Sequence, residues 1–379
     1  MFMLNALLAA GLALQTATAT PMATAPVAVA AEMPPPPAEV MAIPEGLRRD
    51  FHERVMDGTN SPELRLRRMV DFMFAKDGLD LKYKADATNS VAESYRTRQV
   101  NCLSFTLMAV ALAREAGLKA QGQQIDRVLA WSLVDDVVMQ SMHANAVVTV
   151  KDRNLQVKDG RDFVLDIASG SLYTQDFIVH GFKVEDKRLL ASFYGNRAME
   201  LLAQGRLDES KAWLDEALVL EPDEAMLLNN AGVLSQRAGD VAAAESAFLR
   251  AVNRNPRLMS VLNNLVAMYS ARGDATRATY WKERADSVLR RDPFYQYSVA
   301  ERYAEAGNHE EAVRYYRRAI ALDSRERLFH FGLARAYTYL GRLGPAAKEL
   351  DAAVKLSTED VDRQRFQAKL DALRGMAVR

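Results

Sequence analysis

Three residues in the first half of the chain have the types and the order of an activated thiol nucleophile. Cys102 is the only cysteine among 379 residues, and His143 and Asp166 follow it along the chain. In such a set the histidine takes the proton of the thiol, and the carboxylate fixes the imidazole tautomer and stabilises its cation. Asp162 has the same strand parity as Asp166 and is the alternative carboxylate. Each residue alone has a plainer interpretation, since a lone cysteine is often a small buried apolar side chain.

The helix that would carry Cys102 is predicted between Asn101 and Gly117. Ser104 and Thr106 are its only polar side chains before the last turn. A helix that is apolar on nearly every side belongs inside a globule. Asn101 is a suitable N-cap and Gly117 a suitable end, which places Cys102 in the first turn. There the positive end of the helix dipole favours the thiolate.

The elements around this helix predict an α+β arrangement. Apolar residues recur at helical spacing in the stretches 61–78 and 90–98. The stretches 142–150 and 161–168 have the pattern of strands, and the residues between them suit an antiparallel pairing. The first strand starts beside the histidine of the candidate set and the second ends near its aspartate. Helices followed by paired strands indicate a central helix packed on antiparallel strands.

Several short motifs surround these residues. They are Leu79-x-Leu81-x-Tyr83, Thr88, Ala92-Glu93, Asn101-Cys102-Leu103-Ser104-Phe105, His143-Ala144-Asn145-Ala146-Val147 and Phe163-Val164-Leu165-Asp166. Together they resemble the transglutaminase-like superfamily of papain-type cysteine enzymes, over roughly residues 60 to 180. The resemblance implies a nucleophile at the start of a buried central helix, with histidine and aspartate on adjacent antiparallel strands. It thereby implies an acyl-transfer site made of Cys102, His143 and Asp166, in a transglutaminase-like domain assigned to residues 45–185.

Two positions depart from the pattern of that family. Many members carry glycine shortly before the nucleophile, where this chain has Val100 and Asn101. An aromatic residue often follows the histidine by two positions, where this chain has Asn145. Both departures leave the three candidate residues in place, and they imply a different oxyanion hole and substrate cleft.

The start of the chain, residues 1–31, is interpreted as a signal peptide. Residues 4–14 form a short apolar run, and a tract rich in alanine and threonine follows it. Ala17-Thr18-Ala19 or Ala28-Val29-Ala30 would serve as a small-residue cleavage site, although the first basic residue is Arg48. The apolar run is too short to span a bilayer, so no integral membrane span is expected. An exported protein of the bacterial periplasm is the expectation.

The next stretch, residues 32–44, is expected to be a linker. Pro34 to Pro37 are four consecutive prolines. Such a run forms a stiff, extended spacer and does not build a core.

From residue 191 the chain repeats at one fixed period. Glycine and alanine recur at this period at Gly205, Gly239, Gly273, Gly307 and Gly341, and at Ala217, Ala251, Ala285, Ala319 and Ala353. Glycine in the turn between two helices, and small residues where helices cross, at a period of 34 form the tetratricopeptide repeat (TPR) pattern. Five TPR repeats are predicted over residues 191–358, stacked into an all-α superhelix because one helix pair cannot bury its own face. Residues 359–379 are expected to form a capping helix.

Three asparagines share one position in successive repeats. Asn196, Asn230 and Asn264 follow one another at the repeat period on the predicted inner helix. Such an amide ladder would hydrogen-bond the backbone of an extended peptide irrespective of its sequence. Asparagine is also common at this position in TPR repeats, which is the structural alternative. A protein or peptide partner on the concave face is therefore expected.

Composition excludes several other classes of function. Lys and Arg total 49, as do Asp and Glu, so no nucleic-acid surface is indicated. One cysteine and five histidines without metal-ligand spacing argue against a metal centre. A phosphate-binding loop and a dinucleotide fingerprint are both absent from the sequence, so no cofactor is expected.

Two functions remain open. The first is an exported thiol enzyme, a peptidase, amidase or acyltransferase, whose repeats hold a protein substrate. The second is a non-enzymatic TPR scaffold, in which the transglutaminase-like domain is a second binding surface. The enzyme is the favoured interpretation of the sequence, and hydrolysis and transfer are not distinguished because both use the same three residues.

Overall fold

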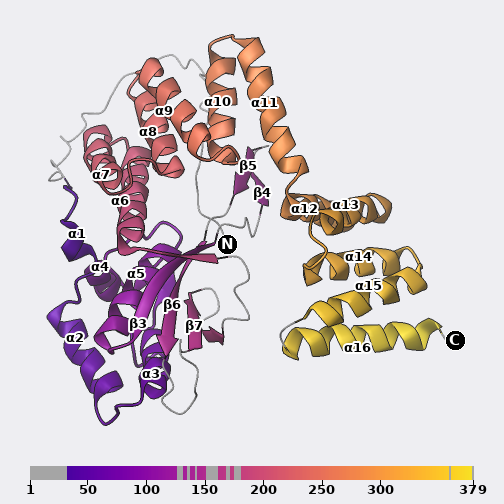
Figure 1. The fold of residues 1–379 in the computed structure, drawn as a ribbon, viewed down its shortest axis with the longest axis horizontal. Coiled ribbons are helices and arrows are strands. Elements are labelled where there is room, and N and C mark those ends of the chain that lie inside the picture. The colour runs from indigo at the N-terminus through magenta and orange to yellow at the C-terminus, as the bar shows by residue number, and fades with distance from the viewer. Residues whose placement is uncertain are drawn as a thin grey trace, which may run out of the picture.

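The computed structural model describes residues 32–125, 131–134, 137–140, 143–150, 161–167, 171–174, 181–357 and 360–377. An α/β part precedes a helical part (Figure 1). The helices of the α/β part are α1 (Pro37–Val40), α2 (Glu45–Phe51), the π-helix η1 (His52–Met56), α3 (Pro62–Phe74), α4 (Val91–Thr97) and α5 (Cys102–Glu115). Its strands are β1 (Lys82–Tyr83), β2 (Gln99–Val100), β3 (Lys119–Ile125), β4 (Trp131–Val134), β5 (Val137–Gln140), β6 (His143–Val150), β7 (Arg161–Asp166), β8 (Ser171–Thr174) and β9 (Gly181–Val184).

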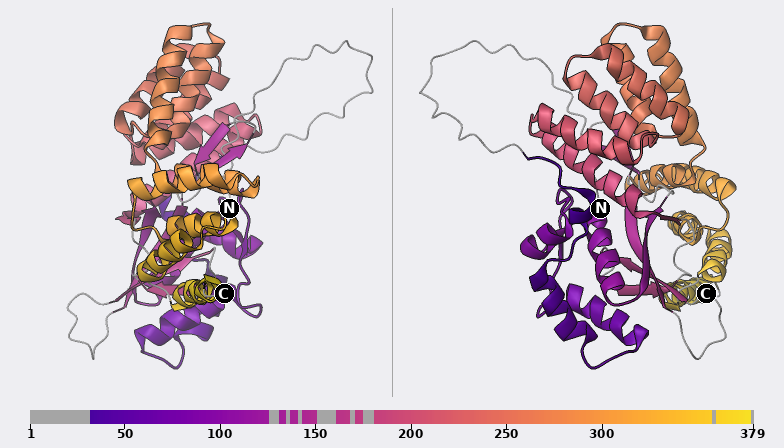
Figure 2. Two further views of the ribbon diagram at one scale, coloured as in Figure 1. Left: turned by 90° about the vertical axis from the view of Figure 1, so that its right-hand side faces the viewer. Right: turned by 60° about the vertical axis from the view of Figure 1, so that its left-hand side comes forward.

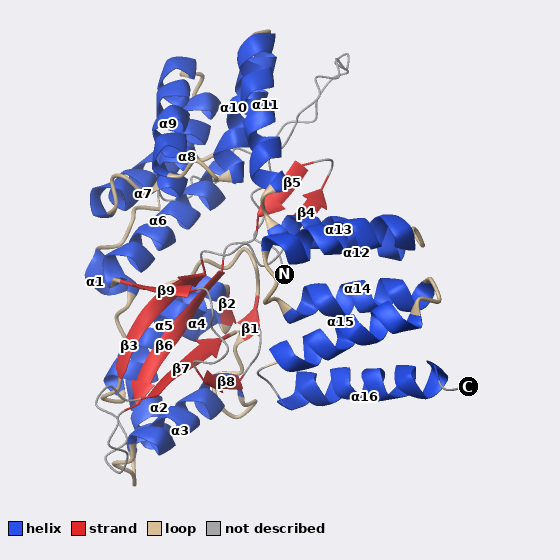
Figure 3. Cartoon of the chain, turned by 45° about the vertical axis from the view of Figure 1, so that its right-hand side comes forward, coloured by secondary structure: helices blue, strands red, loops and turns tan. Residues whose placement is uncertain are grey.

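Five of these strands form one antiparallel sheet in the order β8-β7-β6-β3-β9 (Figure 3). The expected antiparallel pair is present as β6 and β7, with Ala146 opposite Leu165. The sequence pattern does not predict β3, which lies between β6 and β9. Of the remaining strands, β1 and β2 pair in parallel, and β4 and β5 form an antiparallel pair of their own.

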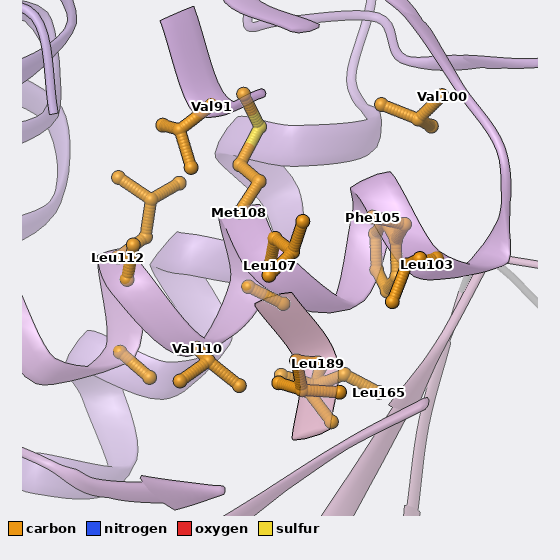
Figure 4. Close-up of a cluster of buried hydrophobic side chains, with 14 of the residues drawn as sticks. Val91, Val100, Leu103, Phe105, Leu107, Met108, Val110, Leu112, Leu165 and Leu189 are labelled. Atoms are coloured by element: carbon orange, nitrogen blue, oxygen red, sulfur yellow. The ribbon is translucent and has the colours of Figure 1, made fainter. Parts of the chain in front are cut away.

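Helix α5 is the centre of the α/β part. Every residue from Cys102 to Ala113 is buried, and the helix packs on β3, β6 and β7. Phe105, Leu107 and Leu112 contribute to a cluster of apolar side chains that surrounds it (Figure 4). The prediction of a helix buried on nearly every side is confirmed.

The ends of the predicted helices agree with the capping signals. Asn101 caps α5 by accepting a hydrogen bond from the main-chain N–H of Ser104 at 2.8 Å. Gly117 follows the helix with a φ of +75°, a left-handed conformation that glycine adopts without strain. Ser90 caps α4 in a capping box with Glu93.

The helical part consists of five helix pairs and one final helix. The inner helices are α6 (Asp186–Ala203), α8 (Ala225–Arg237), α10 (Met259–Ala271), α12 (Pro293–Glu305) and α14 (Arg327–Tyr339). The outer helices are α7 (Leu207–Leu220), α9 (Val241–Arg254), α11 (Ala275–Arg290), α13 (His309–Leu322) and α15 (Leu343–Leu356), and α16 (Asp360–Ala377) closes the stack. The helix α16 packs on α15 and buries Phe366, Leu370 and Leu373, as expected of a cap.

The α/β part and the first repeat share one hydrophobic core. The cluster around α5 continues through Leu189 and Phe193 of α6 into Trp213 of α7. Two further clusters lie in the later repeats, one spanning α8 to α14 and the other α12 to α16. The first repeat is therefore fused to the α/β part, and the later repeats have cores of their own.

The stretch 32–44, expected to be an extended spacer that builds no core, packs against the folded part of the chain. Val40 in α1 is fully buried in the core around α5, and the carbonyl of Pro35 accepts a hydrogen bond from the Tyr194 hydroxyl at 2.6 Å. The proline run therefore lies against the first repeat. Proline content predicted stiffness, but it did not show that a surface on the repeats matches this segment.

The stack of repeats changes direction between α11 and α12 (Figure 2). The helix α11 has 16 residues, whereas α7, α9, α13 and α15 have 14. Only Arg291 and Asp292 separate α11 from α12, compared with the four residues 255–258 between α9 and α10. Pro293 then starts α12 at its first helical position.

None of the helices in the described ranges is long and apolar enough to cross a membrane.

Candidate functional site

Cys102 occupies the expected place at the start of α5. It is the first residue of the helix, and 3% of it is exposed. Its main-chain carbonyl accepts a hydrogen bond from the Thr106 hydroxyl at 2.7 Å. A thiol in this position lies at the positive end of the dipole but has little contact with solvent.

A short segment ahead of α5 holds the start of the helix in place. The Ser104 hydroxyl donates to the carbonyl of Ala87 at 2.9 Å and accepts from the main-chain N–H of Asn89 at 2.7 Å. The Asn101 side-chain amide donates to the Thr88 hydroxyl at 2.9 Å. The few polar residues at the start of this buried helix thus have partners in residues 87–89, so the position of Cys102 is rigidly defined.

Tyr83 is the aromatic neighbour of the thiol. It ends β1, where it pairs with Val100 of β2 two residues before Cys102. Burial raises the pKa of the Tyr83 phenol, and a negative charge on Cys102 raises it further. The phenol therefore stays neutral beside the thiol.

The structure places the two other members of the predicted triad on neighbouring strands. His143 is the first residue of β6 and Asp166 the last of β7. Because Ala146 lies opposite Leu165, both positions are at the same end of the sheet, and α5 packs across both strands. The side chain of His143 lies outside the described residues. The structure thus brings the three elements together, and the geometry of the triad stays a prediction.

The alternation of β7 bears on the role of Asp166. Leu165 and Ile167 belong to the core that contains α5. Successive side chains of a strand point to opposite faces of the sheet. Asp166 therefore points to the face that is turned away from this core.

Asp162, the alternative carboxylate, lies near the opposite end of β7. It pairs with Lys183 at 2.6 Å and accepts a hydrogen bond from the Thr149 hydroxyl at 2.6 Å. Burial acts to raise the pKa of Asp162, but the hydrogen bonds from Lys183 and Thr149 outweigh it and lower the pKa below its ordinary value. This carboxylate is engaged in a cross-strand ion pair.

The asparagine positions of the repeats are mostly buried. Asn230 and Asn264 are 6% and 3% exposed, and Asn196 is half-buried. The Asn264 amide donates to Asn229 Oδ1 at 2.9 Å and so joins α10 to α8. Asn229 is not one of the three asparagines predicted from the repeat spacing. Peptide binding by the three predicted asparagines stays a prediction.

A charged contact between the last two repeats was also missed. Arg335 on α14 pairs with Glu301 on α12 at 2.5 Å, and the Tyr316 hydroxyl donates to the same carboxylate. Burial and the Glu301 carboxylate raise the pKa of Tyr316. Glu301 and Arg335 occupy the same position in successive repeats, so opposite charges at one repeat position were the available signal.

The hairpin of β4 and β5 reaches the inner helices of the repeats. Strand β5 contacts α10, and strand β4 contacts α12 (Figure 3). Successive inner helices pack on one another at the α6–α8, α8–α10 and α12–α14 steps. At the α10–α12 step, a segment of the α/β part lies against both helices.

Metal ligands are not gathered in the part of the chain that the structure describes, where no group of three or more His, Cys, Asp or Glu residues could hold an ion.

Comparison with known proteins assigns the helical part. Residues 196–258 and 298–361 match the model of the tetratricopeptide repeat family. The chain is 29% identical over 116 residues to the photosystem I assembly protein Ycf3 of Rippkaea orientalis (strain PCC 8801 / RF-1), a match that covers 30% of this chain and 67% of Ycf3.

Two solved structures are similar to the chain. PilF of Pseudomonas aeruginosa is 15% identical, with a TM-score of 0.27 over 50% of this chain and 87% of PilF. YrrB, described as a TPR protein with an unusual peptide-binding site, is 18% identical, with a TM-score of 0.24 over 47% of this chain and 92% of YrrB. The family match and the helix pairs together show that the second half of the chain is made of tetratricopeptide repeats, a module that binds proteins and peptides.

Proposed function

We propose that this protein is a scaffold that binds a segment of a partner protein on the inner helices of its TPR repeats. The β4–β5 hairpin, which lies against α10 and α12, carries this proposal. This contact supports the view that the surface formed by α10 and α12 can bind an extended segment that does not belong to the repeats. The hairpin sequences, Trp-Ser-Leu-Val and Val-Val-Met-Gln, are mainly apolar, so the partner segment is expected to be apolar and extended as well.

Competition for this position would regulate the scaffold. While the hairpin lies against α10 and α12, a partner has to displace it. The apparent affinity of the partner is then the intrinsic affinity multiplied by the fraction of molecules in which the site is free. A partner that binds the same helices would therefore release the hairpin. The α/β part would act in this way as an internal competitor.

The first experiment tests this competition. Residues 131–140 are replaced by a Gly-Ser linker of equal length, and a fluorescent peptide of sequence 131–140 is titrated into both chains. We expect the peptide to bind the replaced chain about tenfold more tightly than the intact chain. A chain in which residues 151–160 are replaced by the same linker is the matched control, and it should bind like the intact chain. Equal binding to all three chains, or binding to none, would refute the proposal.

We also propose that the protein is exported to the periplasm. The apolar run at residues 4–14 and the small residues that follow it support this proposal. Fractionation of cells that express residues 1–379 tests it, and recovery with cytoplasmic markers would contradict it.

A second candidate function is acyl transfer through Cys102, His143 and Asp166. The position of Cys102 at the start of α5, above β6 and β7, supports it. It ranks second because a nucleophilic cysteine is usually partly exposed, whereas Cys102 is 3% exposed. The alternation that turns Asp166 away from the core around α5 is a further argument against it.

The pH dependence of Cys102 alkylation separates the two functions. An activated pair reacts well below the free-thiol pKa of about 8.5, and His143→Ala slows the reaction. A buried, inactive thiol instead reacts slowly at every pH and ignores the substitution. The scaffold proposal expects the second behaviour, and the acyl-transfer proposal requires the first.

A further inference from the structure

The first described residues of the chain lie against the first repeat. The carbonyl of Glu32 accepts a hydrogen bond from Trp213 Nε1 at 2.7 Å, and the carbonyl of Pro35 accepts one from the Tyr194 hydroxyl at 2.6 Å. The main-chain N–H of Glu32 donates to the carboxylate of Glu209. An extended segment is thus held through its backbone at both ends.

Among the described residues, carboxylates outnumber guanidinium groups around Glu32. The Glu32 carboxylate contacts the guanidinium groups of Arg197 and Arg206. Arg197 also pairs with Glu200 at 3.2 Å, and Arg206 with Glu209. In these ion pairs three carboxylates meet two guanidinium groups, and all except Glu32 come from the first repeat. The carboxylate of Glu93 in α4 adds a further negative charge near Arg197.

The carboxylate of Glu209 accepts the hydrogen bond from the main-chain nitrogen of Glu32. A hydrogen bond from Arg206 lowers the pKa of Glu209, and the N–H of Glu32 lowers it further, so the group is ionised at neutral pH. An amide N–H at this position satisfies one acceptor but supplies no charge. An ammonium group would supply the missing positive charge at the atom that already makes the contact.

On the basis of the export proposed above, we propose that the chain is cut between Ala31 and Glu32, and that Glu209, Trp213 and Tyr194 of the first repeat bind the new amino-terminal segment. The residue ahead of the cut, Ala31, is small, and the candidate cleavage motif Ala28-Val29-Ala30 comes directly before it. Hydrolysis by such a protease adds one oxygen of water to the carbonyl carbon of Ala31. Both protons of that water go to the nitrogen of Glu32, which leaves a carboxylate and an ammonium group.

Processing then completes the first repeat. The ammonium group of Glu32 pairs with Glu209 and adds a positive charge to the cluster, while Trp213 and Tyr194 hold the carbonyl groups of Glu32 and Pro35. Because the first repeat shares its core with α5, removal of the leader adds a stabilising contact to the whole α/β part. A chain that still carries residues 1–31 lacks this charge.

Chemical blocking of the amino terminus tests the proposal on one folded chain. A chain of residues 32–379 with a free amino group is compared with the same chain N-acetylated, because acetylation keeps the N–H donor but removes the charge. We expect the free form to melt about 1–3 °C higher at pH 6.5. Pairing with Glu209 raises the pKa of the amino group above its ordinary value of about 8, so the difference is lost as pH rises through that raised value.

Two variants and one mass measurement complete the test. Glu209→Gln should remove the difference between the free and acetylated forms, while Asp208→Asn, at an exposed neighbouring carboxylate, should keep it. In an export-competent bacterium that expresses residues 1–379, mass spectrometry should find a terminus at Glu32. Equal melting temperatures of the two forms, a difference that survives Glu209→Gln, or a terminus at another residue would each overturn the proposal.

Discussion

Among the described residues, the α/β part meets the repeats at the first repeat and at the step from α10 to α12, and the two contacts are built differently. At the first repeat, α6 and α7 share one continuous core with α5, and Glu32 to Pro35 are bound by Trp213 and Tyr194. At the step from α10 to α12, the contact is made by the β4–β5 hairpin. The contact at the first repeat buries large aromatic side chains. The contact at α10 and α12 involves the two short strands β4 and β5. We infer that the first is a permanent anchor and that the second can open.

The largest expected effect breaks the anchor. Trp213 is 3% exposed and lies 5.9 Å from the ring of Phe193, measured between ring centroids. Trp213→Ala leaves a cavity and removes the hydrogen bond to Glu32, so it is expected to cost about 3–5 kcal/mol. Hydrogen exchange should show loss of protection in α5 as well as in α7, because both belong to one core.

The matched control is the same substitution in a later repeat. Trp281 on α11 is 7% exposed and belongs to the second cluster. Trp281→Ala should leave the protection of α5 unchanged. Loss of protection in α5 with both variants would mean that the repeats and the α/β part unfold as one unit.

A smaller effect tests the independence of the middle repeats. Asn264→Ala leaves the buried Oδ1 of Asn229 without its partner at 2.9 Å, which costs about 1–3 kcal/mol. The opening free energy of α8 to α11, measured by hydrogen exchange, should fall by this amount. Asn308→Ala is the control at an exposed position whose side chain makes no capping bond, and about 0.5 kcal/mol or less is expected there.

The last repeats are expected to respond to pH. His330 on α14 contacts Glu349 at 2.7 Å through Nδ1 and the carbonyl of Ser324 at 3.0 Å through Nε2. The Glu349 hydrogen bond raises the pKa of His330 against the effect of burial, and the bond to Ser324 adds to it. The stabilisation is complete below the unfolded pKa of about 6.5 and is lost as pH rises through the higher folded pKa.

Hydrogen exchange can follow this change in α14 and α15. Between about pH 6 and pH 8 their opening free energy should fall by about 1 kcal/mol, after correction for the intrinsic pH dependence of exchange. Glu349→Gln should remove the pH dependence of this opening free energy. The opening free energy of α5 should change neither with pH in this range nor with the substitution. A flat profile in the unaltered chain would show that the pair adds nothing to this repeat.

The smallest effect is expected on the surface. Arg342 pairs with Glu310 at 2.5 Å, and both side chains are about half exposed. Arg342→Ala should cost roughly 0.2–1 kcal/mol, and less at high salt, because solvent and ions screen the pair. Thermal unfolding at low and at high salt measures it, and a cost that does not depend on salt would contradict this view of the pair.

The two regions also differ in how far the sequence predicts them. In the repeats, each position occurs five times, so the spacing of Gly205 to Gly341 was sufficient to predict helix pairs and their turns. In the α/β part, Asn101 predicted the start of α5 because a cap is a local signal. Strand β3 carries Gln121, Gln123 and Gln124 and lacks an apolar alternation, so its pairing with β6 and β9 had no local signal.

The candidate sites follow the same rule. The position of Cys102 and the burial of its helix were predicted because both depend on one apolar helix. The face to which Asp166 points was not predicted, because it depends on which side of β7 packs against α5. The contacts of Glu32 and Pro35 with the first repeat were not predicted either, since Trp213 and Tyr194 occupy ordinary core positions of a repeat and the proline run has the composition of a linker.

The short connection between α11 and α12 has a consequence for the length of a ligand. Because the stack changes direction there, the inner surface is divided into a stretch of three repeats and a stretch of two. An extended peptide that follows one stretch has to bend to continue along the other. A partner with two short motifs joined by a flexible linker suits this surface better than one long motif does. Its avidity would then depend on the length of that linker.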